Sequence, residues 1–554
     1  MVDISTLSIL LLLAMFLLLA IGMPLGFASA VLAVGVLVLK FGPNVLYGNV
    51  TGGIEMVLDG NLSEGIDTAF SKFGRGPLGV ISQAVYRQMT NYILISVPLF
   101  IFMASILERS GIAKDMYSSI NVWLSRTRGG IAIVTSIMAV IMAAMSGIIG
   151  GEVVLLGLIA LPQMLRLGYN QNLAIGTICA SGSLGTMIPP SIVLIFYGLI
   201  TETSIKALFT AAFLPGFILA SSFILYIIIR TRLRPEDAPL PEPIPGEPEG
   251  NEKRILFGTF LTILASGAVA LLLARTLFLT VIGANAVVEG ADPIKFGMVA
   301  DLPMLIILLI VGLGLLQFVF KKDRVLLAWD MGKGLVAPII VIGVVLGSIY
   351  GGITGITEAA GMGVVAVFTL SVLRGEMTFD VVWDSLMRTM KSTGTIIWVT
   401  IGAASLAAAY TLAGGPTYIA NLIVDQNLPT MGIILAMMFV FLIMGMFMDW
   451  VGIVLLIMPV FLPIVLRLPV EELGFWGQIE PKYVGIWFGV VFCMNMQVSF
   501  LSPPFGPAAF YLKSVAPAHI TLTDIFKGFM PFIALQLVSL LILLTWPNLI
   551  TVFL

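Results

Sequence analysis

Apolar stretches long enough to cross a lipid bilayer recur along almost the whole of this chain, for example at 5–22, 91–107, 205–229, 393–415 and 528–549. A membrane-spanning helix needs about 20 apolar residues in a row. Of the 554 residues 59% are hydrophobic and only 10% are charged, which leaves too little polar surface to cover a soluble fold. Because backbone groups inside lipid must be paired within a helix or a closed barrel, these stretches predict an all-α polytopic membrane protein.

The few charged residues exclude one class of partner and favour one orientation. The formal net charge is −2 and the basic residues are scattered, so nucleic acid is not expected as a partner. If the N-terminus faces outward, the predicted cytoplasmic segments hold 19 of the 28 Lys and Arg, as the positive-inside rule requires. These segments lie around 108–130, 164–172, 230–254, 321–334, 374–392 and 513–527.

One segment, 231–253, departs from the apolar pattern, because proline and acidic residues replace it. Such a composition predicts a linker, here on the cytoplasmic side, rather than a packed element. It separates a first membrane half, residues 1–230, from the remainder of the chain. We predict an accessory transmembrane hairpin at 254–320 and a second membrane half at 321–554.

The two halves contain a degenerate internal repeat. LPQMLRL at 161–167 recurs as LPIVLRL at 462–468, and the pair Pro189 and Pro190 recurs as Pro503 and Pro504, each pair preceded by a cysteine ten residues earlier. In the topology derived from charge, Arg166 lies inside and Arg467 outside. The copies would therefore cross the membrane in opposite senses, as in the inverted repeats of secondary transporters.

Each proline pair interrupts an apolar stretch and predicts a broken helix, at about 171–200 in the first half and about 484–515 in the second. A break frees backbone carbonyls, which membrane depth tolerates only where protein, water or an ion satisfies them. A simple proline kink would explain one copy. Two copies in matching surroundings favour a binding site.

A second irregular segment lies upstream of each break, AAMSGIIGGEV at 143–153 and MGMFMDWVGIV at 444–454. We interpret these as the tips of two re-entrant hairpins, an inner one at about 129–163 and an outer one at about 430–466. The tips fall near Ser146 and Gly147 in the first half, and near Met448 and Asp449 in the second. Reading each as two ordinary short spans would invert every later loop of the predicted topology.

Three acids, Glu152, Glu358 and Asp449, are predicted to lie deepest among apolar residues, where charged groups are costly and usually functional. Asp449, at a predicted hairpin tip, is the strongest candidate of the three. Glu152 and Glu358 fit a structural role at helix ends equally well. His519, the only histidine, falls in a predicted cytoplasmic loop and is interpreted as a surface residue.

Other classes of membrane protein fit less well. An intramembrane enzyme needs a nucleophile with a base, or metal ligands, and the sequence has no HExxH or GxSxG motif. A primary pump needs a nucleotide-binding P-loop, and GxxxxGK[ST] does not occur. A passive channel leaves the inverted, doubly broken segments unexplained. The sequence therefore predicts a carrier that is not an enzyme.

The chain resembles the large membrane subunit (M protein, DctM-like) of the tripartite ATP-independent periplasmic (TRAP) transporters. The residues that carry this resemblance are VPLFIFMASILERSGIAKDMY at 97–117, RGGIAIV at 128–134, MSGIIGGEV at 145–153, GSLGTMIPPSIVLIFYG at 182–198 and GGITGITEAAG at 351–361. The resemblance implies an elevator-type secondary active transporter of the bacterial inner membrane. It also implies symport of an organic acid with sodium ions, a small four-helix membrane subunit and a periplasmic solute-binding protein.

The family's sites carry over onto matching positions of this sequence. The resemblance implies a first sodium site at Ser146, Ile148, Gly185, Ile188 and Pro190, mainly through carbonyl oxygens. By symmetry it implies a second sodium site near Asp449, Ser499, Ser502 and Pro504, and a substrate site at Ser146, Gly147, Ser191 and Asp449. Two departures are the tip SGIIGG, which is poor in hydroxyl residues, and Gly355, which stands where the family has a threonine.

One alternative stays open at this point, a self-sufficient ion-coupled carboxylate carrier or exchanger of the same architecture that needs no binding protein. The sequence names no substrate. It also offers few buried cations that could pair with a carboxylate, so the N-termini of the broken helices are the expected anion ligands.

Overall fold

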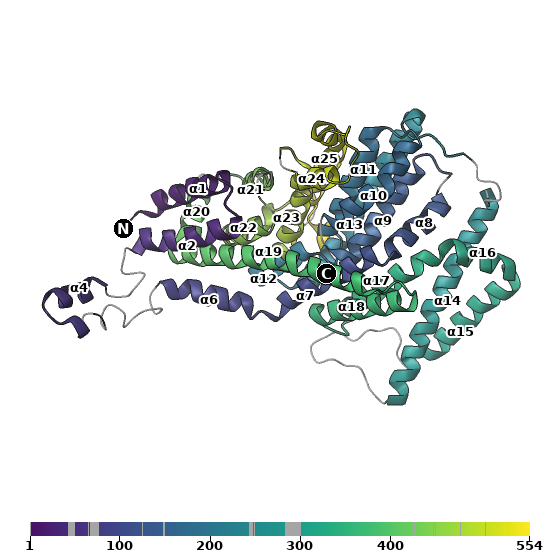
Figure 1. The fold of residues 1–554 in the computed structure, drawn as a ribbon, viewed down its shortest axis with the longest axis horizontal. Helices are drawn as coiled ribbons and strands as arrows, with labels where there is room; N and C mark the ends of the chain where they lie inside the picture. Colours follow the sequence, from purple (N-terminus) through teal and green to yellow (C-terminus); the bar gives the residue numbers. More distant parts are fainter. Residues whose placement is uncertain are drawn as a thin grey trace.

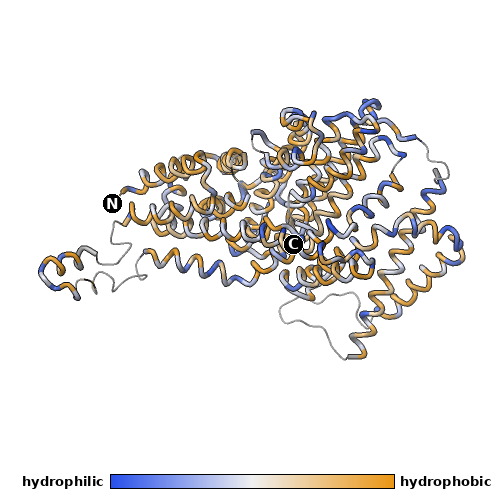
Figure 2. The backbone as a smooth tube through the Cα atoms, in the orientation of Figure 1, coloured by the Kyte–Doolittle hydropathy of each residue, from blue (hydrophilic) through white to orange (hydrophobic). Residues whose placement is uncertain are grey.

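The computed structural model describes residues 2–41, 50–64, 66, 77–124, 126–147, 150–242, 248, 250–282, 301–424, 428–446, 448, 450–476, 478–504 and 506–554. Throughout these residues the regular structure is helical, with no strand, which confirms the predicted all-α class. Nine of the described helical segments are long and apolar enough to cross a membrane. The helices are largely hydrophobic along their length and polar residues gather at many of their ends (Figure 2).

The part of the chain before the linker forms eleven of the α-helices that the structure describes. In order they are α1 (Ile4–Ala20), α2 (Leu25–Phe41), α4 (Val50–Leu58), α6 (Leu78–Met89), α7 (Ser96–Arg109), α8 (Ile112–Leu124), α9 (Gly130–Ser146), α10 (Gly151–Arg166), α11 (Gln171–Ser183), α12 (Ile192–Thr201) and α13 (Ile205–Leu233), with a 3-10 turn, η2 (Leu184–Thr186), between α11 and α12.

The part after the linker begins with α14 (Gly250–Ile282) and α15 (Leu302–Gly314), which pack on each other. They stand at one edge of the molecule beside α16 (Figure 1). The remaining helices are α16 (Lys322–Gly332), α17 (Val336–Tyr350), α18 (Ile356–Leu373), α19 (Phe379–Leu412), α20 (Gly415–Val424), α21 (Thr430–Gly445), α22 (Trp450–Val465), α23 (Val484–Leu501), α24 (Pro507–Lys513), α25 (Leu522–Thr545) and α26 (Asn548–Thr551).

Helix α19 organises the packing of the N-terminal helices. It has 34 residues, and at about 1.5 Å per residue it is about 50 Å long, well beyond the roughly 30 Å of a bilayer's hydrocarbon core. It packs against α2, α6, α7 and α22. Residues 379–392, which the charge pattern assigns to a cytoplasmic segment, are the first turns of this helix. Two of their side chains, Asp384 and Arg388, form ion pairs with α7.

The two repeat units have matching helix orders. In the first, α9 and α10 form a helical hairpin, α11 and α12 flank the break, and α13 follows with Pro215 inside it. In the second, α21 and α22 pair in the same way, α23 and α24 flank the break, and α25 follows with Pro531 inside it. The repeat predicted from short motifs therefore extends over five helices in each half.

Where the two repeat units meet, each packs a helix onto the hairpin of the other. The helix after the first break, α12, packs on α22 of the other unit, and the helix after the second break, α24, packs on α10. Helix α11 packs along α25, and α13 packs along α23. Each break therefore lies inside a core that both halves build, and neither half closes around its own break alone.

Cysteine labelling tests whether the repeats are inverted. Gly168 and Pro469 follow the two LPxxLRL copies and both are exposed. We expect Gly168→Cys, in a Cys179→Ala, Cys493→Ala background, to react in intact cells only with a membrane-permeant thiol reagent. Pro469→Cys should also react with an impermeant one, because opposite senses place the two positions on opposite faces.

The same assay tests whether each hairpin begins and ends on one face of the membrane. Arg128→Cys should then behave like Gly168→Cys, and Leu428→Cys like Pro469→Cys. The background without the two native cysteines, both of which are buried, is the blank. Equal labelling of all four positions would mean parallel repeats, and disagreement within a pair would mean that the hairpin helices are ordinary spans.

Candidate functional site

The break in the first half is a short irregular segment whose hydrogen bonds leave several carbonyls unused. The N–H groups of Met187 and Ile188 both donate to the carbonyl of Leu184, at 2.9 Å each. The hydroxyl of Ser191 donates to the carbonyl of Thr186 at 2.5 Å and accepts from the N–H of Leu194 at 3.4 Å, which caps α12. Ser191 thus fixes where α12 begins.

Three of the predicted cation ligands are among the unused carbonyls. Within the described part of the chain, no hydrogen bond reaches the carbonyl oxygens of Gly185, Ile188 or Pro190. Pro189 and Pro190 have no N–H, so the helical ladder cannot continue across them. Since buried carbonyls are rarely left without a partner, this segment is suited to hold a cation.

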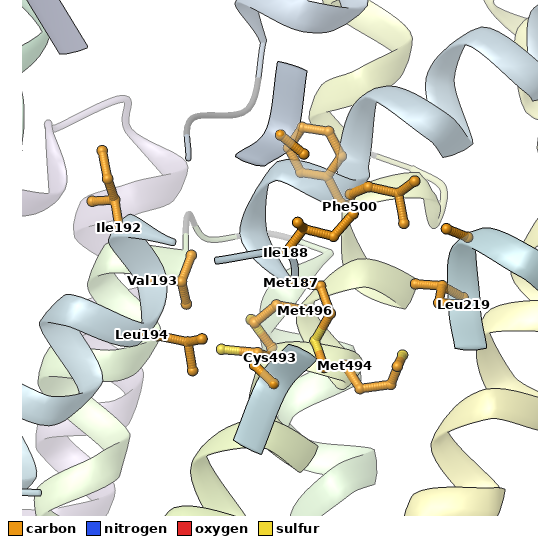
Figure 3. Close-up of a cluster of buried hydrophobic side chains, with 14 of the residues drawn as sticks. Met187, Ile188, Ile192, Val193, Leu194, Leu219, Cys493, Met494, Met496 and Phe500 are labelled. Atoms are coloured by element: carbon orange, nitrogen blue, oxygen red, sulfur yellow. The ribbon is translucent and has the colours of Figure 1, made fainter. Parts of the chain in front are cut away.

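At Met187 and Ile188 only the backbone of the break is available to a ligand, because both side chains face the apolar core. Met187 and Ile188 point into an apolar cluster between α12 and α23, among Val193, Leu194 and Met496 (Figure 3). All five of these residues are buried or nearly so. Ile188 therefore offers a ligand only its carbonyl, as the sequence predicts for carbonyl coordination.

The tip of the α9–α10 hairpin lies against this break. The carbonyl of Gly147 accepts a hydrogen bond from the N–H of Ile192 at 3.4 Å. Gly147 has φ +60°, and a side chain there would overlap the carbonyl oxygen of Pro190. Only glycine fits this backbone conformation at such close approach. The structure thus brings Ser146 and Gly147 together with the break; Ile148 lies outside the described residues.

Glu152 occupies the first turn of α10, and it is 1% exposed. Its carboxylate accepts a hydrogen bond from the hydroxyl of Ser146. Its second oxygen, Oε2, has no partner among the described groups. A buried carboxylate with one unpaired oxygen is costly. The hydrogen bond from Ser146 places Glu152 at the hairpin tip. It fixes the side chain of Ser146, which leaves the Ser146 carbonyl as the group a cation would use.

The second break has different surroundings. The hydroxyl of Ser502 donates to the carbonyl of Val498 at 2.8 Å, and that of Ser499 to the carbonyl of Asn495 at 3.3 Å. Pro504 is exposed, whereas Pro190 is buried. Both serine hydroxyls therefore serve the end of α23, and the residues proposed for a second site are less enclosed than the first set. Asp449 lies outside the described residues.

Two buried glutamines connect the halves at the first break. The amide of Gln497 in α23 donates to the hydroxyl of Thr186, and that of Gln536 in α25 lies 3.5 Å from the hydroxyl of Ser183. Both side chains are fully buried, and their carbonyl oxygens have no partner among the residues the structure describes. Sequence reasoning missed them; the available signal was an amide inside an apolar span.

The other two candidate residues, Glu358 and His519, lie away from this site. Glu358 was expected deep among apolar residues, and this is wrong: it is exposed, and Tyr92 donates a hydrogen bond to it at 3.0 Å. It stands in the first turn of α18, where the helix borders a cavity of about 930 Å³. His519 is exposed, as the sequence predicts.

Comparison with known proteins gives one family over nearly the whole chain. The model of the family described as "Tripartite ATP-independent periplasmic transporter, DctM component" matches residues 12–549. The C4-dicarboxylate TRAP transporter large permease protein DctM of Pseudomonas aeruginosa is 24% identical and covers 88% of this chain and 92% of its own. The ectoine/5-hydroxyectoine TRAP transporter large permease protein UehC of Ruegeria pomeroyi is 27% identical, with coverages of 82% and 84%.

One solved structure with a similar arrangement is that of Neisseria gonorrhoeae MtrF, from a class of antimetabolite efflux pumps. It has a TM-score of 0.47 and 12% identity, and the match covers 85% of this chain and 84% of that one.

Proposed function

The chain belongs to the DctM family of the tripartite ATP-independent periplasmic transporters, and on this premise we propose that it is the large permease subunit for sodium-driven uptake of a small organic acid. The observation that carries the proposal is the meeting of Ser146 and Gly147 with the free carbonyls at Gly185, Ile188 and Pro190. A cation and a carboxylate can bind there side by side. The relatives named for C4-dicarboxylate and for ectoine support an acid as substrate.

Sodium is the proposed coupling ion at the first break. Hard cations prefer oxygen ligands, and the tip and the break offer backbone carbonyls from two sides. In the described residues no group of three or more His, Cys, Asp or Glu stands ready to hold a metal, so carbonyls are the natural ligands. We place a second sodium ion near Asp449, Ser499, Ser502 and Pro504 by analogy between the halves. Ser191 and Gly147 complete the proposed substrate site.

The proposed mechanism is an elevator in the bacterial inner membrane. The unit that moves would comprise both hairpins, both broken helices and their flanking helices, with α2, α6, α7 and α19 as the fixed frame. The exchanged packing supports grouping the two repeat units together, because α12 packs on α22 and α24 packs on α10, so each unit holds a helix of the other. The two hairpins would be re-entrant, opening the site to opposite sides in turn.

A small four-helix membrane subunit and a periplasmic solute-binding protein are the proposed partners. Reconstituted with the small subunit alone, the chain should take up free substrate at about a tenth or less of the rate measured with the binding protein present. Delivery by a protein raises the local substrate concentration at a site that offers few ligands of its own. Radiolabelled uptake into proteoliposomes, with and without the binding protein, measures the ratio.

A mismatched binding protein from another such system is the control, because it should not restore uptake. Saturable uptake at full rate without any binding protein would favour the alternative function, a self-sufficient ion-coupled carrier or exchanger of this architecture.

A further inference from the structure

A small cavity adjoins the hairpin tip at Ser146 and Gly151. Its volume is about 210 Å³, and it lies between the tip, α7 and α19. The residues that matter for its chemistry are Ser105 and Glu108 from α7, Ser146 and Gly151 from the hairpin, and Arg388 and Ser392 from α19. Sequence reasoning missed Arg388 because it assigned 374–392 to a cytoplasmic segment.

Arg388 is the only cationic side chain that lines this cavity among the described residues. One of its terminal nitrogens, Nη1, donates to the carboxylate of Glu108, whose side chain is 11% exposed. In the part of the chain that the structure describes, its other terminal nitrogen, Nη2, and its Nε have no hydrogen-bond partner. A guanidinium presents five N–H donors in a fixed plane, so it can hold one carboxylate and still bind a second.

The hairpin brings the start of α10 to the same place. A side chain at Gly151 would overlap the Glu108 carboxylate and would lie 2.7 Å from Nη2 of Arg388. The backbone at Gly151, which carries no side chain, therefore faces the ion pair of Glu108 and Arg388. The first N–H groups of a helix have no hydrogen-bond partner within that helix. Helix α10 has 16 residues, and the positive end of its dipole favours an anion at this position.

Ser105 gives an independent sign that a ligand belongs here. Its residue is 2% exposed, it lines the cavity, and its hydroxyl has no partner among the described groups. A buried hydroxyl without a partner costs free energy that a bound acceptor would recover. The ion pair of Arg388 and Glu108 therefore stands beside a cavity that also contains an unpaired buried hydroxyl.

We propose that this cavity is the subsite for the carboxylate group of the transported acid in the state that the structure describes, with Arg388 of the fixed frame as its cationic ligand and Ser105 and the first turn of α10 as further donors. Glu108 orients Arg388 and balances its charge while the subsite lacks substrate. The inference rests on the proposed function and adds to it the group that recognises the acid. It replaces the expectation that helix N-termini alone bind the anion.

Protection of an introduced thiol tests the proposal on the full chain with its small subunit in lipid vesicles containing sodium. The probe is succinate, and neutral succinamide is its matched control. In a Ser392→Cys, Cys179→Ala, Cys493→Ala parent, succinate should slow maleimide labelling and succinamide should not. Glu108→Gln removes the competing anion, so the concentration of succinate that gives half protection should fall about tenfold.

Glu108→Gln together with Arg388→Gln should abolish protection while the labelling rate without succinate stays the same. The double change avoids leaving Glu108 buried without its partner, which Arg388→Gln alone would do. Asp115→Asn with Arg374→Gln, which removes another ion pair outside this cavity, is the matched control and should keep protection. Absence of protection in the parent, or its persistence without Arg388, would overturn the subsite.

The same vesicles separate the two claims. Uptake driven by the binding protein that survives Glu108→Gln with Arg388→Gln would leave the proposed function intact and refute the subsite. Protection without uptake in the parent would support the subsite and count against the proposed function.

Discussion

Replacing sodium by choline on both sides of the membrane is expected to lower the apparent affinity for substrate about a hundredfold and to end concentrative uptake. The physical reason is that the carbonyls of Gly185, Ile188 and Pro190 have no partner among the described residues. A cation there would be coordinated by these carbonyls, and its charge would favour an anion at the adjoining tip. Substrate uptake into proteoliposomes at graded sodium concentrations measures the change.

Potassium at the same ionic strength is the control, since it screens charge equally and should not replace sodium at the proposed site. Uptake driven by a pH gradient in sodium-free vesicles would contradict the assignment. Attention would then move to Glu152, whose buried carboxylate has one unpaired oxygen.

Gly147→Ala is expected to reduce uptake about a hundredfold while the protein still inserts in the membrane, because a misplacement of about 1 Å at such a site costs about this factor. The added methyl group would overlap the carbonyl oxygen of Pro190 and lie 3.5 Å from the nitrogen of Ile192. Both neighbours are backbone atoms that cannot rotate away. The tip and the break must therefore separate, and the proposed first sodium site opens.

Gly375→Ala is the matched control for the backbone. Gly375 has φ +70°, similar to Gly147, and nothing lies within 4 Å of the position its methyl group would take. Both variants bear the cost of a left-handed residue, roughly 1–2 kcal/mol. Normal uptake by Gly147→Ala would mean that the tip does not need this contact. Equal loss in both variants would assign the effect to backbone strain.

The sequence predicted the parts of this fold that follow from local chemistry. Proline pairs cannot continue a helix, and irregular interruptions cannot continue an apolar span, so both breaks and both flanking helix pairs could be located within a few residues. That the helix pairs are re-entrant stays a prediction. The internal repeat then related the break and the hairpin of the first half to those of the second. The contact of Gly147 with the break could be anticipated only as a shared site, since the distance depends on how α9 packs.

Prediction from the sequence failed where a helix continued through polar residues. Arg388 belongs to an α19 that runs far past the apolar stretch at 393–415, and an apolar window cannot register those turns. Glu358 was expected to be buried because its neighbours in sequence are apolar, yet it faces a cavity. Sequence neighbours show which residues border an acid along the chain and not which side of the helix it occupies.

Gln497 and Gln536 illustrate a further limit. Each meets its partner in the other half, more than 300 positions away along the chain. No local pattern encodes such a pairing, because it arises only when α23 and α25 pack against the first break.

The exchange of α12 and α24 between the halves has a bearing on how the cell makes this protein. The first hairpin is not covered by α24 until about 270 residues after the end of α13 have been added, which takes roughly 15–55 s at the usual speed of a ribosome. During that interval Gly150 lacks the ring of Tyr511 that later lies against it. Assembly of the permeation unit is thus a late event in biogenesis, and a nascent chain that stalls in the second half presents membrane proteases with an uncovered core.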